Sequence, residues 1–389
     1  MIFTDKDQHK KDGYNIKDIT IQVTGDCNLA CTYCYLHSKN HKVIDIEDGK
    51  KFIEAIVTNN QSFWRGYMNF ADSEIDGIAL QFIGGEPLFN YKAVIELCDY
   101  FTECCKKHHR EQFYRLTTFG ICTNGTIYNK EIEDFLLKYK GKVDLAISID
   151  GNKQLHDTCR VYKDGSPSYD IVVKNLEKFR KLMPACRPIN TKATISPDNV
   201  YYIYDSVVNL MDNLGFHKIP MNCIQEPGWT IEHAKTLYQQ LKKVADWILE
   251  RGYRWNSIYE DSDNYRDLTM FNDRLFTRLQ QEEYDSAWCG GNGHMLFLQC
   301  DGKIYNCNRY SETSVGNPER DLVIGNVSNG ITNWGNINCM RCATVKTMYP
   351  KECLACPVAK GCWDCLAYCY EVHGEFKKVT NICVMHKAR

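Results

Sequence analysis

The sequence has no uninterrupted apolar run of the ~18–20 residues that a membrane-spanning helix needs, which excludes a membrane span. Its opening residues, MIFTDKDQHKKDG, are polar and lack the apolar stretch of a signal peptide, so we expect a cytoplasmic protein. An excess of positive charge is also missing, because 47 Lys and Arg stand against 49 Asp and Glu, and this excludes a nucleic-acid partner. Internal repeats and low-complexity tracts are absent as well. What remains is an ordinary globular chain.

Cysteine, in contrast, is abundant. The 389 residues include 21 cysteines. Thiols of a cytoplasmic chain stay reduced, so metal ligation explains them better than disulfides do. Two groups stand out, within residues 27–34 and 289–383. We expect the isolated cysteines to be small buried hydrophobic residues; these are Cys98, Cys104, Cys105, Cys122, Cys159, Cys186 and Cys223.

Short apolar runs alternate with segments of helical period over the first 230 residues. The predicted strands are 17–27, 77–87, 119–126, 142–151, 190–199 and 218–228, and the clearest helices are 91–109 and 169–183. This alternation predicts an α/β fold with a parallel sheet, a barrel or part of one, whose site lies at the carboxyl ends of the strands. A helix over 230–252 follows. The tail after Trp288 has little regular periodicity, so we expect metal to hold it together.

The stretch TGDCNLACTYCYL (24–36) carries Cys27, Cys31 and Cys34 in C-x3-C-x2-C spacing. Three thiolates on one loop suit a cubane iron–sulfur cluster and leave its fourth iron open. A structural zinc site is the alternative, but it wants four ligands, usually in C-x2-C pairs. No His stands at a matching spacing, although His37 lies close.

This cysteine pattern, with Tyr33 before its last member, resembles the radical S-adenosylmethionine (SAM) superfamily. GGEP (84–87) at the next strand end resembles that superfamily's second motif. The resemblance covers essentially the whole chain and implies a partial (β/α)6 TIM-like barrel. It further implies that SAM completes the open iron, that an electron from the cluster cleaves SAM, and that the 5′-deoxyadenosyl radical abstracts a substrate hydrogen. A reducing partner such as flavodoxin or ferredoxin would supply the electron.

The same resemblance implies SAM contacts at several strand ends. Gly84, Gly85 and Glu86 would meet the SAM amino group, and the backbone of Tyr33 would meet the adenine. Ser148 would bond the ribose or carboxylate, and Arg160 would pair with the SAM carboxylate. Ile195 and Met221 would pack on the adenine, unless they are ordinary strand core.

The tail resembles the SPASM extension, which binds two auxiliary 4Fe–4S clusters, making three clusters in all. The resemblance implies that Cys353, Cys356, Cys362 and Cys383 hold the outer cluster, and that Cys289, Cys307 and Cys365 hold the inner one. We accordingly divide the chain into a lead-in (1–16), a radical SAM core (17–230), a helical linker (231–287) and a SPASM domain (288–389).

Two departures from the family pattern leave the ligands open. Cys362 and Cys365 have two residues between them instead of the usual three, so Cys369 is an alternative ligand. The inner cluster has no evident fourth ligand; Cys300, Cys339 and Cys342 are all available, or its iron is open. Zinc also stays an alternative for the tail, because C-x2-C pairs suit it.

SPASM proteins mostly modify peptides, and the end of this chain resembles maturases of ribosomally made, Cys-rich precursor peptides. That predicts a thioether or carbon–carbon cross-link. The rival is an anaerobic sulfatase maturase, in which an Asp follows the cysteine that matches Cys307; here Asn308 stands there and cannot accept a proton. We expect no N-terminal leader-binding module, so the barrel, residues 231–287 or a separate protein would bind the leader. A non-catalytic electron carrier or scaffold would not need the SAM motifs.

Overall fold

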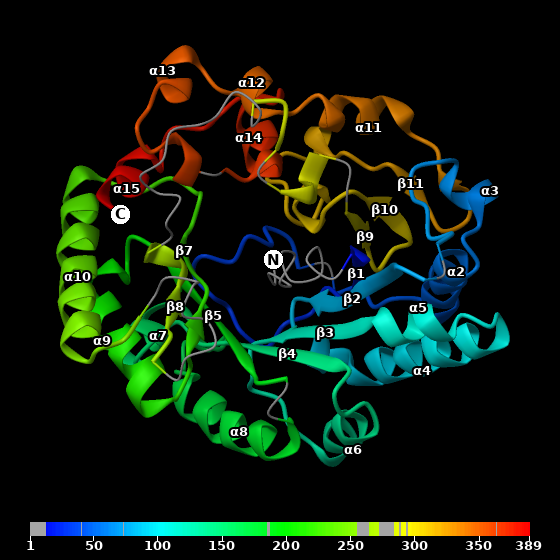
Figure 1. Ribbon diagram of the computed structural model, residues 1–389, viewed down its shortest axis with the longest axis horizontal. Helices are drawn as coiled ribbons and strands as arrows, with labels where there is room; N and C mark the ends of the chain where they lie inside the picture. The colour runs from blue at the N-terminus through cyan, green and yellow to red at the C-terminus, as the bar shows by residue number, and fades with distance from the viewer. Residues whose placement is uncertain are drawn as a thin grey trace.

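The computed structural model describes residues 13–389 except 40, 73, 185–186, 255–263, 272–283, 288, 293–294 and 363. Its central feature is a curved run of six parallel strands in the order β1-β2-β3-β4-β5-β7 (Figure 1). These strands are β1 (Asn15–Thr24), β2 (Asp76–Gly84), β3 (Thr118–Thr123), β4 (Val143–Ser148), β5 (Asn190–Ile195) and β7 (Met221–Cys223). The fold is therefore the predicted partial α/β barrel.

Helices cover the outer face of this sheet. They are α2 (Ile46–Val57), α3 (Gln61–Trp64), α4 (Tyr91–Lys107), α5 (Glu111–Leu116), α6 (Lys130–Lys138), α7 (Lys153–Cys159), α8 (Tyr169–Leu182), α9 (Ile203–Val208) and α10 (Ile231–Glu250). The interior of β1 is buried almost throughout, as expected for a parallel strand covered on both faces. A strand forms within each of the six predicted ranges, and each strand ends before its predicted range does, because the last residues already belong to the loops that follow. The predicted strand 218–228 is divided at Pro220 into β6 (Lys218–Ile219), which lies in a separate sheet, and β7.

The C-terminal region continues the same sheet. Strand β9 (Leu296–Leu298) pairs in parallel with β1, with Ile19 opposite Leu296. Antiparallel strands β10 (Lys303–Tyr305), β11 (Gly325–Asn326) and β12 (Gly330–Ile331) extend it outward. A separate two-stranded sheet joins β6 (Lys218–Ile219) to β8 (Asp267–Leu268). The tail is thus joined to the barrel through hydrogen bonds along the β1 edge, and the domain division at 288 stays a prediction.

The remaining helices run across the open side of the barrel. They are α11 (Trp334–Arg341), α12 (Val345–Met348), α13 (Lys351–Leu354), α14 (Leu366–His373) and α15 (Cys383–Ala388). Figure 1 shows them arching from β11 to α15, which lies beside α10. Among the described residues, no helix combines the length and apolarity that crossing a bilayer demands.

Candidate functional site

The three-cysteine loop begins where β1 ends, at the carboxyl edge of the sheet. Cys27 is buried, whereas Cys31 and Cys34 are half-buried. The Leu29 amide donates a hydrogen bond to Cys27 Sγ at 3.4 Å, and Asn124 Nδ2 lies 3.8 Å from the same sulfur. Donors of this kind are typical partners of cluster thiolates, whose potential they tune.

The donor chemistry of this loop fits a cubane cluster. Burial raises the pKa of Cys31 to about 11; the charge of Arg160 opposes this rise, whereas Asp150, Cys34 and Cys27 add to it. Over the residues that the structure describes, no three His, Cys, Asp or Glu side chains converge where they could hold one metal ion. A cubane does not require such convergence, because each thiolate binds a different iron.

The GGE segment lies against the cysteine loop. The Gly85 amide donates to the Thr24 carbonyl at 3.1 Å, and the Glu86 amide donates to the Asp26 carbonyl at 2.8 Å. A Cβ on Gly85 would lie 2.4 Å from the Asp26 oxygen and 2.8 Å from Cys27 Cβ. Glycine is therefore required here by close approach of two backbones. The two motifs that are separate in sequence form one surface.

Glu86 is fully buried at this junction, and its side chain ties the end of β3 to the loop after β2. It accepts hydrogen bonds from Leu88 N at 2.9 Å, Thr123 Oγ1 at 2.7 Å and Asn124 N at 2.6 Å. Burial raises the pKa of Glu86 to about 7, and the hydrogen bonds counteract part of that rise. Sequence reasoning missed Thr123 and Asn124, although their place directly at the end of a predicted strand was a signal.

Arg160 lies near the cysteine loop, held by a buried carboxylate that sequence reasoning also missed. Its Nε donates to Asp150 Oδ2 at 3.0 Å, and its guanidinium lies 5.4 Å from the centre of the Tyr33 ring. The Tyr33 hydroxyl donates to the same Asp150 carboxylate. Asp150 thus engages the Nε atom of Arg160, and pairing of the terminal amino groups with the SAM carboxylate stays a prediction. Ser148 ends β4 close by, 4.0 Å from Cys122 Sγ.

The other residues predicted to touch the adenine lie deeper. Ile195 and Met221 are fully buried in the hydrophobic core, which is the alternative role considered for them. Two of the isolated cysteines differ from expectation: Cys122 and Cys223 are only partly buried, because each sits at or next to the carboxyl end of its strand. Cys98, Cys104, Cys105 and Cys159 are buried as predicted, and Cys186 lies outside the described residues.

The four cysteines predicted for the outer cluster line one cavity, which we call the outer cavity. Its wall is formed by Tyr349, Cys353, Cys356, Val358, Ala359, Cys362, Lys378, Cys383 and His386. Elements α13, α15 and the turn before Cys362 converge to form it. Residues 30 positions apart are thereby brought around one space, as a four-thiolate cluster requires.

The predicted inner cysteines gather around Tyr310, at the end of the short helix η9 (Asn308–Tyr310). Burial raises the pKa of this phenol, and the Cys289, Cys307 and Cys365 sulfurs add to the rise. Cys369 acts on Tyr310 in the same way and lies one turn after Cys365, with its amide bonded to the Cys365 carbonyl at 2.9 Å.

The other cysteines considered for the fourth inner position lie elsewhere. Cys300 is buried next to Asp301, whereas Cys339 on α11 and Cys342 at the C-cap of that helix are exposed. Among the four, Cys369 is the one that shares surroundings with the three predicted ligands. The fourth ligand of the inner cluster stays a prediction: either Cys369 binds the fourth iron, or that iron has no protein ligand.

A polar bridge joins the two cysteine loops. Asn308 Nδ2, directly after Cys307, donates to Tyr35 Oη, directly after Cys34, at 2.8 Å. Arg309 lies 5.0 Å from the centre of the Tyr35 ring and pairs with Glu226 at 3.1 Å. Through these contacts the residues that follow Cys307 and Cys34 pack directly against one another.

A partial α/β barrel with a three-cysteine loop at its strand ends and a cysteine-rich C-terminal region defines the class of this protein. The family description "Radical SAM superfamily" matches residues 21–195, from β1 to β5. The chain is also 30% identical to the serine-type anaerobic sulfatase-maturating enzyme of Bacteroides thetaiotaomicron, over 75% of this chain and 69% of that protein. It belongs to the radical SAM superfamily and, within it, to the SPASM-type enzymes.

Two further likenesses fall in the same group. The radical SAM cyclopropyl synthase TigE of Paramaledivibacter caminithermalis is 25% identical over 76% of this chain and 58% of its own. The solved structure "Native anSMEcpe with bound AdoMet and Cp18Cys peptide" shares the fold, with a TM-score of 0.68 and 18% identity over 96% of this chain and 95% of that one. The chain spans less than three fifths of the length of the first curated relatives that it matches.

Proposed function

We propose that this protein cleaves SAM reductively and uses the 5′-deoxyadenosyl radical to install a thioether or carbon–carbon cross-link in a ribosomally made precursor peptide. The observation that carries the choice of a cross-link is Asn308. Its amide lies beside Tyr35 at the position where a sulfatase maturase carries an Asp base, and an amide does not accept a proton at neutral pH.

Each group of residues has a part in this activity. Cys27, Cys31 and Cys34 would hold the cluster that, together with bound SAM, supplies the radical. The GGE segment and Arg160 would hold the amino acid end of SAM, since one offers backbone carbonyls and the other a guanidinium fixed by Asp150. Tyr35, Asn308 and the Arg309–Glu226 pair would position the peptide between SAM and the inner cysteines.

The inner cysteines would serve the second half of the reaction. Joining a thiol to a carbon radical releases one proton and one electron, and an inner cluster is the natural acceptor of that electron. If its fourth iron is open, the substrate thiolate can bind there; if Cys369 occupies the position, electron transfer alone is left. Counting protein ligands at the inner cluster by spectroscopy separates these two forms.

Sulfatase maturation is the second candidate function. It is supported by the 30% identical relative and by the match of the whole fold to a structure that holds a Cys peptide. Against it stands Asn308, unless Glu226 or another acid replaces the missing base. A formylglycine product carries an aldehyde, which a hydrazide probe traps, whereas a cross-linked peptide does not react.

One experiment tests the proposal. The chain is purified anaerobically, reconstituted with iron and sulfide, and incubated with SAM, dithionite and a short Cys-containing peptide, taken from a reading frame beside its gene where there is one. We expect about twelve irons per chain by cluster stoichiometry, formation of 5′-deoxyadenosine, and a peptide that has lost two hydrogens without gaining an aldehyde. Cys27→Ala should abolish SAM cleavage. An aldehyde product would establish the rival function, and absence of 5′-deoxyadenosine would exclude both.

The partner that binds the leader of the precursor stays open. Of the predicted linker 231–287, the structure describes α10 and a few short segments, whereas 255–263 and 272–283 lie outside the described residues. Leader binding by this region, by the barrel or by a separate protein, and electron supply by a flavodoxin or ferredoxin, are parts of the same proposal. Binding assays with the leader peptide and the purified chain would test the first.

A further inference from the structure

Lys378 is a buried lysine in the wall of the outer cavity. Its side chain is 3% exposed, and lysine is rarely buried to that extent without a partner. Its Nζ lies 3.4 Å from Cys362 Sγ and 3.4 Å from the Cys362 carbonyl oxygen. The ammonium therefore faces one of the four cysteines that line this cavity.

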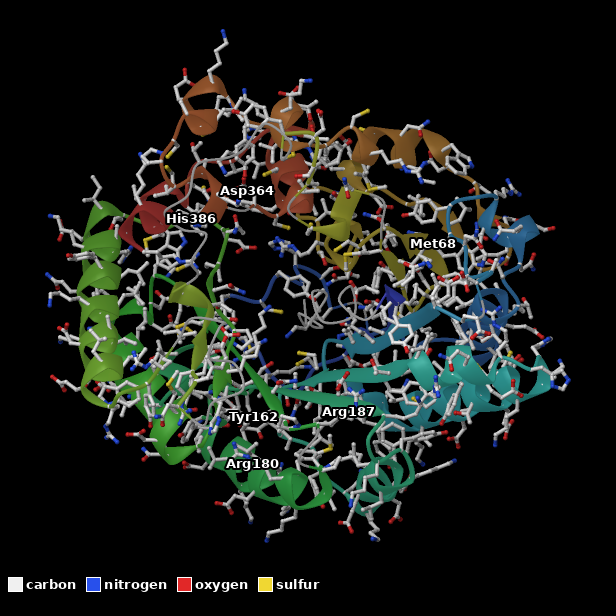
Figure 2. The ribbon with its side chains drawn as sticks, viewed as in Figure 1. Met68, Tyr162, Arg180, Arg187, Asp364 and His386 are labelled. Atoms are coloured by element: carbon white, nitrogen blue, oxygen red, sulfur yellow. The ribbon has the colours of Figure 1, made fainter. Side chains whose placement is uncertain are left out.

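Two side chains hold the ammonium in place. The Asp364 carboxylate, 1% exposed, pairs with Lys378, and Tyr349 Oη donates to the same Oδ2 atom at 2.7 Å. Lys378 Nζ also lies 4.1 Å from the centre of the Tyr349 ring. Figure 2 labels Asp364 in this C-terminal part of the chain, together with His386 of the cavity wall. The arrangement fixes a charged donor at a definite point beside Cys362.

The positive charge of Lys378 would favour reduction of an iron–sulfur cluster held in the outer cavity. The buried Asp364 carboxylate pairs with Lys378 and compensates the charge of its ammonium group, as a buried lysine requires. Reduction of an iron–sulfur cluster adds one negative charge. A nearby cation that donates N–H to a cluster sulfur favours that reduced state, and hydrogen bonds to sulfur are a recognised determinant of potential.

We propose that Lys378, positioned by Asp364 and Tyr349, sets the reduction potential of the outer cluster through its contact with Cys362. Asp364 and Lys378 act in opposite directions: the ammonium raises the potential, and the carboxylate limits that rise. The inference rests on the proposed function, because it requires a cluster on Cys353, Cys356, Cys362 and Cys383.

The test is an anaerobic redox titration of the reconstituted holoenzyme, followed by electron paramagnetic resonance. In Lys378→Gln we expect one of the three midpoint potentials to become more negative, with at least a tenfold lower ratio of reduced to oxidised cluster at fixed potential, or about 59 mV for one electron. Asp364→Asn should shift the same potential in the positive direction. Lys378→Arg, which keeps the charge and a donor, should restore most of the wild-type value.

Lys377→Gln is the matched control, because Lys377 is the adjacent residue and is exposed. It should leave all three potentials unchanged. Full iron content with unshifted potentials in Lys378→Gln and Asp364→Asn would overturn the inference and leave the cluster assignment intact. Loss of about four irons from Lys378→Gln, Asp364→Asn and Lys378→Arg alike would also overturn the inference. The Lys378–Asp364 pair would then be needed for folding of the cluster site and not for its potential. A wild-type chain with only about four irons would instead overturn the proposed auxiliary clusters.

Discussion

Asp150 shows how much of the site depends on a residue outside every motif. It is fully buried, pairs with Arg160, accepts the Tyr33 hydroxyl, and receives the Thr194 amide at 2.9 Å. Tyr33 belongs to the cysteine loop, so this one carboxylate links that loop to the arginine expected to bind SAM. Removing one partner of a buried ion pair leaves an uncompensated charge.

We therefore expect Asp150→Asn to lower the free energy of unfolding by about 3 kcal/mol and to weaken SAM binding. Isothermal titration of SAM into the reconstituted protein and denaturant unfolding measure the two effects. Asp246→Asn, on the exposed face of α10, is the control and should change neither. Wild-type SAM affinity in Asp150→Asn would show that Arg160 does not depend on this carboxylate.

His156 makes the stability of the same region depend on pH. Its Nδ1 accepts the Asp150 amide at 3.4 Å, its Nε2 bonds Ser168 Oγ at 3.0 Å, and Ser168 donates to the Arg160 carbonyl at 2.6 Å. The ring is therefore neutral, with its proton on Nε2. Burial, and to a smaller extent the charge of Arg160, lower the pKa of His156 to about 3.

Because the folded pKa is below the unfolded value of about 6.5, this histidine contributes stability that is present above pH 6.5 and is lost as the pH falls toward 3. Between about pH 7.5 and about pH 5 the loss should be about 2 kcal/mol. This loss can be measured by comparing the free energies of unfolding of the wild type and His156→Gln at both pH values. Parallel pH profiles would mean that His156 does not titrate in this way.

Ligand-type residues could be found from the sequence because a cluster site needs them at fixed spacings. Residues whose role depends on being buried could not be found in this way. The cysteine and GGEP spacings led to residues that the fold brings together at the strand ends or around one cavity. Lys377 and Lys378, in contrast, are identical neighbours in the sequence, yet one is exposed and the other is buried beside Asp364. Only the tertiary packing distinguishes them.

At the scale of elements, the contact between the GGE segment and the cysteine loop is the most constrained feature. A methyl group on Gly85 would overlap backbone atoms of the loop, and backbone cannot move aside as a flexible side chain can. Gly85→Ala should displace the loop and lower iron content from about twelve toward about eight per chain. SAM cleavage should be lost with it.

Gly335→Ala is the matched control for this change. Gly335 lies on α11, and its added Cβ would make only an ordinary contact of 3.4 Å with Asn333 Oδ1. Alanine is also the better helix former, so stability should be equal or slightly higher. Iron analysis and 5′-deoxyadenosine assays on both variants check the pair; full iron content in Gly85→Ala would contradict the constraint.

Element positions were predictable because strand and helix periodicities are local, and α4, α8 and α10 begin and end within two residues of expectation. The pairing of β9 with β1 was not predictable, since a three-residue strand carries almost no periodic signal. Its partner lies at the other end of the chain. Pairing between strands so far apart in the sequence depends on how the whole chain folds, not on local sequence.

For the whole molecule, the continuous sheet predicts that barrel and tail depend on one another. Without β9, the edge of β1 would present unpaired backbone groups, which favour aggregation. A chain cut to residues 1–287 should therefore elute from a sizing column as soluble aggregate or be insoluble, whereas the full chain elutes as a defined species. A monodisperse, folded 1–287 fragment would show that the tail is an independent unit.

The β1–β9 pair also orders events during synthesis. On the ribosome, Ile19 is made long before its partner Leu296, which follows only after the entire barrel has been made. The strand that leads into the three-cysteine loop therefore has one unpaired edge until β9 has been made. Contacts so distant along the chain form slowly, and exposed edges invite misassembly. We therefore expect folding of this protein to depend on chaperones, or on slow translation, more than its ordinary composition would suggest.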